Sequence, residues 1–188
     1  MPSILLTAPA IEPLTLSEAK DWLRVEHGDD NAIIAALIAS ARSHVEAHTR
    51  RALIAQTWRL IRDVWPTDGR IAVLPAPLRE ALAARVYDAE GLAYAVDIEA
   101  FVADTASSVL AFAPWSLRQP GRPFAGIEID VESGYGENAA DVPAPLRQAI
   151  RILLAHWYEH RGMVSEGAAA ALPAGVASLI APFRVASL

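Results

Sequence analysis

The sequence has no cysteine and a single lysine, and both features restrict what the chain can do. Without cysteine it can form no disulfide, no thiolate metal site and no cysteine nucleophile, so its core must be held by packing alone. Lys20 is the only lysine, and the formal net charge is -6. A general nucleic-acid binder needs clustered Lys and Arg to neutralise phosphates, so the charge argues against that class of protein.

Long hydrophobic runs are also missing, although hydrophobic residues make up 53% of the chain. The longest apolar stretches, such as residues 32–39, are far shorter than the roughly 20 residues of a membrane span, so we expect no membrane partner. The apolar start of the chain has no basic residue and is interrupted by Pro2 and Pro9. We therefore expect no cleaved secretory signal and take the cytoplasm as the default compartment.

Helical periodicity marks both ends of the chain. Thr15 and Glu18 have the spacing of a capping box, which predicts a short helix over residues 16–25. Apolar residues at three- and four-residue steps then predict a long helix from about residue 31 to Thr49. After residues 134–136, a third stripe predicts a helix capped by Asp141 and ending near residue 162, and a short helix follows near the C-terminus.

Between these helical ends the pattern changes to short alternating or apolar runs separated by turn residues. The runs extend from Gln56 to Val131 and predict several short strands, although residues 76–84 could be helical by propensity. We therefore predict an α+β fold with a helical core and an inserted small antiparallel β region, residues 57–136. Residues 1–56 would supply two helices of the core, and residues 137–188 one long and one short helix, packed together as one domain.

Four of the five histidines form two i,i+4 pairs, which could present metal ligands from a helix face. The pairs are His44 with His48 and His156 with His160. Residues 156–160 even read H-x-x-E-H, a spacing in which two histidines bind zinc and the glutamate is a general base. If both pairs faced each other, they would form the site of a metal-dependent hydrolase. We prefer the alternative that these histidines lie near helix C-termini, where the helix dipole favours them without a metal, and we expect no cofactor.

The apolar C-terminal segment, residues 172–188, fits a self-contained fold least well. Its large side chains cannot bury much surface within so short an end, and exposed apolar segments usually mark a partner site. The apolar side chains in question are those of Leu179, Ile180, Pro182, Phe183 and Leu188. The alternative is that the segment packs back on the helices of its own chain.

Five stretches, in order along nearly the whole chain, resemble the head-to-tail connector (adaptor) proteins of tailed phages and phage-derived gene transfer agents. They are residues 13–25 with the acidic pair 29–30, residues 51–58, residues 134–136 with 142–143, residues 155–161, and residues 172–184. The middle of the chain, about residues 65–124, matches the family only in its β-like character with turns. His160 stands where the family more often has a neutral polar residue. The single lysine, with arginine and alanine favoured elsewhere, indicates a GC-rich genome and favours a gene transfer agent.

The resemblance implies a structural role and no enzymatic activity. It implies a ring of about twelve copies, closed by head-to-tail packing, in the neck of a particle assembled in the bacterial cytoplasm. The ring would bind the portal protein, offer a surface to the tail-side stopper or tail-completion protein, and extend the DNA channel. Residues 57–136 carry 11 acidic and 7 basic side chains, which suits a channel through which DNA passes without specific binding.

In this family the C-terminal segment tends to contact the portal, so the resemblance also gives the apolar tail a role. We expect Phe183 to be the buried anchor of that contact and Arg184 a charge at its rim. The full set of expected portal-binding residues is Leu179, Ile180, Pro182, Phe183 and Arg184.

Overall fold

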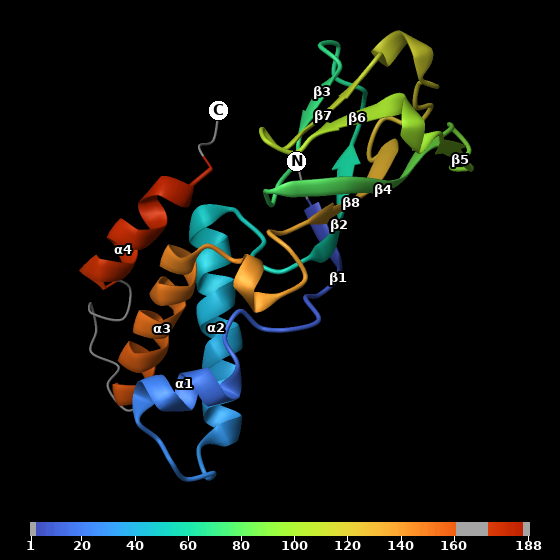
Figure 1. Cartoon of the computed structure of the whole chain (residues 1–188). Helices are drawn as coiled ribbons and strands as arrows, with labels where there is room; N and C mark the ends of the chain where they lie inside the picture. The colour runs from blue at the N-terminus through green and yellow to red at the C-terminus, as the bar shows by residue number, and fades with distance from the viewer. Residues whose placement is uncertain (1–2, 161–172, 186–188) are drawn as a thin grey trace. The chain divides into compact units, whose positions relative to one another are not determined.

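The computed structural model describes residues 3–160 and 173–185, and the chain divides into two compact units (Figure 1). A β unit comprises residues 1–10 and 55–135, and a helical unit comprises residues 11–54 and 136–188. The α+β class predicted from the sequence is confirmed. Among the helices of the described residues, none is both long and apolar enough to cross a membrane.

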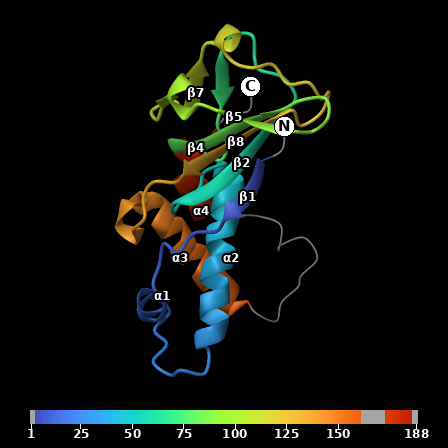
Figure 2. The same ribbon diagram turned by 90° about the vertical axis from the view of Figure 1, so that its right-hand side faces the viewer.

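The β unit contains two antiparallel sheets, which makes it larger than the small β region that the sequence predicts. The five-stranded sheet has the order β1 (Ser3–Thr7), β2 (Gln56–Arg62), β8 (Ile127–Ser133), β4 (Leu78–Tyr87) and β5 (Ala93–Val96). The three-stranded sheet has the order β3 (Arg70–Ala72), β7 (Val109–Phe112) and β6 (Phe101–Asp104). Figure 2 shows β4, β8, β2 and β1 of the larger sheet side by side.

Strand β8 shows why this sequence forms a two-faced sheet. Its apolar residues, at positions 127, 129 and 131, are fully buried, whereas its acidic residues alternate with them and lie on the opposite face. The buried face joins one hydrophobic cluster that contains side chains from both sheets, among them Leu60, Ile71, Val86 and Leu110. Residues 78–84, which could have been helical by propensity, are part of β4 because their apolar side chains complete this core.

The helical unit consists of α1 (Leu16–Leu23), α2 (Asn31–Thr49), α3 (Ala144–Glu159) and α4 (Ala174–Ile180). Helix α1 begins with the predicted capping box, in which the backbone N of Glu18 donates to Thr15 Oγ1 over 3.1 Å and the backbone N of Thr15 donates to Glu18 Oε2 over 2.9 Å. It ends where Arg24 adopts a left-handed conformation. Helices α2 and α3 pack their buried stripes together, and the fully buried Ile34, Val45 and Ile150 lie in this core.

The start of α3 differs from the prediction, because Pro143 is the N-cap and Asp141 is not. Asp141 instead closes a preceding short turn, where its carboxylate accepts a 2.9 Å hydrogen bond from the backbone N of Asn138. A side chain at Gly136 would collide with this carboxylate, so the close approach requires glycine.

Candidate functional site

The C-terminal segment packs back on the helical unit, and this corrects the expectation that its apolar side chains bury little. Val176 is 0% exposed and Ile180 is 2% exposed, because α4 contacts both α2 and α3. The backbone is tied down as well: Arg51 Nε donates to the carbonyl oxygen of Phe183 over 2.6 Å, and the backbone N of Val185 donates to the carbonyl oxygen of Thr49 over 3.0 Å. Leu188 lies outside the described residues.

Of the five residues expected to bind the portal, Leu179 and Ile180 lie in α4, Pro182 and Phe183 lie in the 3-10 turn that follows it, Ala181–Phe183, and Arg184 comes directly after that turn. Ile180 is buried within its own unit and fixes α4 in place. Pro182 and Arg184 are exposed, and Leu179 and Phe183 are half-buried. The segment therefore presents apolar surface and one arginine while its backbone is held by the helices beneath it.

The two histidine pairs do not meet as a four-histidine site. The rings of His44 and His48 lie 4.2 Å apart between centroids, and those of His156 and His160 lie 4.6 Å apart. Across the helix interface, His44 meets the edge of Trp157 at 5.5 Å, in a perpendicular arrangement. Among the described residues, no group of three or more His, Cys, Asp or Glu side chains is placed to hold a metal ion.

Local contacts account for these histidines near the C-terminal ends of their helices. His48 Nδ1 lies 2.9 Å from the carbonyl oxygen of His44, and His160 Nδ1 lies 2.8 Å from that of His156. Since a carbonyl oxygen can only accept, each Nδ1 carries the proton and donates. Burial and the neighbouring His48 lower the pKa of His44, which keeps its imidazole neutral at pH 7. The geometry does not favour the metal-dependent hydrolase.

A row of charges covers the outer face of the five-stranded sheet, and Asp130 is its centre. Arg59 Nε and Nη2 donate to the two carboxylate oxygens of Asp130 over 2.7 and 2.9 Å, and Arg85 Nη2 donates to Oδ2 over 2.9 Å. Glu128 accepts from Arg85 over 3.3 Å and from the Tyr87 hydroxyl over 3.0 Å. The strands β2, β8 and β4 supply these side chains in register, since Asp130 stands opposite Arg59 and Glu128 opposite Arg85.

This charge row stabilises the β unit and is not a catalytic set. The hydrogen bonds from Arg59, together with the charges of both arginines, hold the pKa of Asp130 below its ordinary value of 3.8, although burial opposes the shift. The carboxylate is therefore ionised and fully paired, which suits neither a general acid nor a nucleophile. No local motif marks Asp130, but the alternation of acidic and apolar residues along 127–132 is a signal that could have placed it on the outer face.

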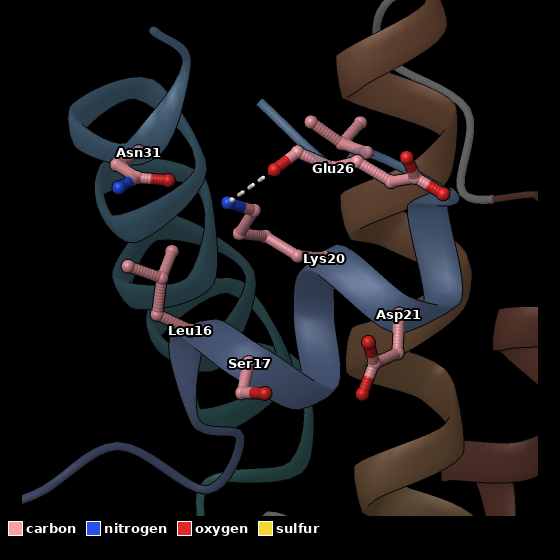
Figure 3. A pocket seen from close by; sticks show the side chains of 7 residues that line it. Leu16, Ser17, Lys20, Asp21, Glu26 and Asn31 are labelled. Carbon is pink, nitrogen blue, oxygen red and sulfur yellow. Dashed lines mark hydrogen bonds between the residues drawn. The ribbon is translucent and has the colours of Figure 1, made fainter. Parts of the chain in front are cut away.

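A hollow of about 460 Å³ lies beside α1 and the start of α2 (Figure 3). It is lined by Leu16, Ser17, Lys20, Asp21, Val25, Glu26 and Asn31. The Lys20 ammonium donates to the backbone carbonyl of Glu26 over 3.5 Å, and the Ser17 hydroxyl points to a different part of the hollow. A nucleophile and its base must lie within hydrogen-bond reach, so this arrangement does not form a catalytic pair.

Comparison with known proteins gives two kinds of match. The family model of phage gp6-like head-tail connector proteins matches residues 13–84. Among solved structures, the chain is similar to a chain in the neck of an empty gene transfer agent (GTA) particle computed with C6 symmetry, with 29% identity and a TM-score of 0.80. That match covers 100% of this chain and 97% of the other. A comparison with curated protein sequences found no match.

Two further structures extend the similarity to complete particles and to a twelvefold neck. A chain in the virion of a native gene transfer agent particle is 26% identical, with a TM-score of 0.81. A chain in the neck of a native gene transfer agent particle computed with C12 symmetry is 27% identical, with a TM-score of 0.79. Both matches cover 100% of this chain and 97% of the other chain. The likeness thus includes both units and the β region that the family model matches only in part.

Proposed function

We infer that this chain is a structural subunit of a particle neck. Both kinds of comparison confirm its resemblance to the head-to-tail connector proteins of phages and gene transfer agents. The observation that carries the inference is the likeness over the full chain to proteins in gene transfer agent necks. The described residues add no competing activity, because the histidine pairs and the hollow beside α1 form no catalytic arrangement. The chain works by binding other proteins.

The subunit forms a closed ring of about twelve copies between the portal protein and the tail-side stopper, and extends the DNA channel. The C12 symmetry of a neck that contains a similar chain supports the copy number. A head-to-tail ring suits this position because each copy uses two different surfaces, so the contacts close on themselves and leave no free end.

The segment from Leu179 to Arg184 forms the portal contact. Pro182 and Arg184 are exposed, and Leu179 and Phe183 keep part of their surface, so these four side chains meet the portal. Ile180 contributes indirectly, because its buried side chain holds α4 on the helical unit. The bond from Arg51 to the Phe183 carbonyl fixes the turn before binding, which lowers the entropy lost when the contact forms.

The β unit supplies the negative charge expected of a DNA channel. Residues 86–117 contain five acidic side chains and no Lys, Arg or His. These five acidic residues are Asp88, Glu90, Asp97, Glu99 and Asp104, which lie in the turns and strand ends around β5 and β6. The acidic residues of β8, by contrast, are paired with arginines and contribute little to the electrostatic potential outside the protein. A negative wall repels phosphate and allows DNA to slide without binding.

Deletion of the gene in the organism that encodes it tests this function. Electron microscopy of the resulting lysate should show DNA-filled heads and separate tails that fail to join, and the full-length gene supplied in trans should restore complete particles. Complete, DNA-delivering particles in the deletion strain would contradict the proposed role.

A further inference from the structure

Strand β1 is an exposed apolar edge of the five-stranded sheet, and a register shift between Leu5 and Thr7 is its one irregularity against β2. Its backbone bonds run to β2 on one side, and no other described segment pairs with its outer side. Ile4 is 47% exposed, and Leu5 and Leu6 are each 43% exposed. Edge strands of independent proteins are normally blunted by charges, proline or a covering segment, because an open apolar edge pairs with other chains. Residues 3–7 contain neither charge nor proline.

Strand β5 is the opposite edge of the same sheet, and the Arg118 guanidinium covers the ring of its Tyr94, 3.4 Å from the ring centroid. It pairs with β4, and within the described part of the chain nothing pairs with its outer side. Its sequence, Ala93-Tyr-Ala-Val96, has no charge, and Leu92 just before it is among the most exposed large apolar residues. One sheet therefore carries two uncharged open edges in a chain in which 20% of the residues are charged.

The directions of the two edges decide which assembly they can build. Every neighbouring pair in the five-stranded sheet is antiparallel, so an odd number of strands leaves β1 and β5 pointing the same way. A copy placed beside another in the same orientation would therefore pair its β1 with the neighbour's β5 as parallel strands. This contact uses two different surfaces, and repeated contacts of that kind close into a ring. Pairing of β1 with β1 would instead give a twofold dimer.

We propose that neighbouring copies of this chain join through these edges, with β1 of one copy alongside β5 of the next, so that the sheets form a continuous belt around the ring. The inference rests on the proposed ring function. The occupant of each edge is a second copy of the chain, because in a cyclic ring, where all copies have the same orientation, this pairing satisfies both open edges of every copy. Backbone hydrogen bonds supply the contact, and Ile4, Leu5 and Leu6 lose their exposed apolar surface in it.

The absence of natural cysteines allows a cross-linking test with strand-face resolution. Ile4 lies opposite Arg59 and Ala95 lies opposite Arg85, so both side chains belong to the charged face of the sheet. Leu5 lies opposite Trp58 and belongs to the core-side face. The Ile4→Cys change is combined with Ala95→Cys, and in a second variant with Ala93→Cys to allow for a slip in register. The matched control combines Leu5→Cys with Ala95→Cys, which places the two thiols on opposite faces.

The variants are bound to the portal protein from the same genome, checked for rings by electron microscopy, oxidised, and separated by non-reducing gel electrophoresis. We expect at least one same-face variant to give a ladder of covalent multimers that ends at the full ring, and the opposite-face control to give far less. Rings without a ladder in either same-face variant would overturn the edge pairing and leave the proposed function standing. A dimer from Ile4→Cys alone would also overturn it, in favour of the twofold contact. No rings from the wild-type chain would overturn the proposed function itself.

A charge variant keeps the test independent of cysteine chemistry. Ile4→Lys places an ammonium on the edge strand, opposite Arg59, and we expect it to reduce ring-bearing portals by about tenfold or more, since charged side chains on an edge strand oppose its pairing with another chain. Ile33→Lys is the control, because Ile33 is an isoleucine of similar exposure, 43%, on α2. Ring formation by Ile4→Lys at the wild-type level would overturn the proposal.

Discussion

Replacing Asp130 by asparagine should destabilise the β unit far more than a neighbouring change of the same kind. Asp130 is only 8% exposed, and its carboxylate accepts three hydrogen bonds of 2.7 to 2.9 Å from two arginines. An amide keeps the shape but removes the charge, and it turns an N–H group toward a guanidinium that can only donate. Hydrogen bonds to charged groups contribute about 1.5–3 kcal/mol each as a class, so we expect a net loss of about 2–3 kcal/mol.

The size of the loss can be measured by thermal unfolding. For a chain of this size, 1 kcal/mol corresponds to roughly 2–4 °C, so the melting temperature should fall by about 5–10 °C. Glu132→Gln is the matched control, since Glu132 lies two residues away on the same face of β8 and pairs with Arg79 alone, with side chains 23% and 34% exposed. Partly exposed single pairs contribute about 0.2–1 kcal/mol, so the control should lose no more than about 4 °C.

The pH dependence of the same pair of proteins gives a second check. Because the pKa of Asp130 is lowered in the folded state, its ionised form stabilises the protein fully above 3.8, and this contribution is lost as the pH falls through the folded value. The difference between wild type and Asp130→Asn should therefore shrink below pH 3.8. Equal melting temperatures at pH 7, or a difference that persists unchanged in strong acid, would show that the Asp130 carboxylate does not stabilise the β unit through its charge.

Three further predictions concern the helical unit. Arg184→Glu should weaken portal binding by about tenfold, as measured by co-sedimentation with the portal protein. The same charge change at the exposed Arg50 should leave binding unchanged. Equal effects of the two changes would show that residues 179–184 do not form the portal contact. Purified protein should contain less than about a tenth of an equivalent of zinc, iron or manganese by elemental analysis, because the histidine pairs do not converge; near-stoichiometric metal would reopen the metal-dependent alternative. Thr15→Ala should cost about 1 kcal/mol of unfolding free energy through loss of the capping box, while Ser17→Ala should cost much less, and a neutral Thr15→Ala would show that the cap does not hold α1.

The sequence predicts those elements whose signals are local. The spacing of Thr15 and Glu18 is enough to predict the start of α1, and the apolar stripe through Ile34 and Val45 repeats often enough to predict α2. Strand β8 is predicted because its side chains alternate between apolar residues on the core face and acidic residues on the outer face. Strand β1 is missed because Ile4, Leu5 and Leu6 are three consecutive apolar residues with no alternation, and their strand form depends on pairing with β2, more than 50 residues later.

The candidate site is predicted less well, because its geometry depends on packing between distant segments. Ile180 has the same apolar character as its neighbours in the sequence, and only contact with α2 and α3 shows that it faces inward while Pro182 faces outward. The histidine pairs are a true i,i+4 pattern, but the residue opposite His44 is Trp157, which no local rule could have given. The arginines of the charge row come from β2 and β4, far from Asp130 in the chain.

A connector ring on a portal can be seen by electron microscopy of the two proteins together. The chain is mixed with the portal protein from the same genome, and negatively stained particles are compared with each protein alone. We expect added ring-shaped density at the tail-side end of the portal, with about twelve copies in the averaged image. Bare portals at a large excess of the chain would show that it is not a connector subunit.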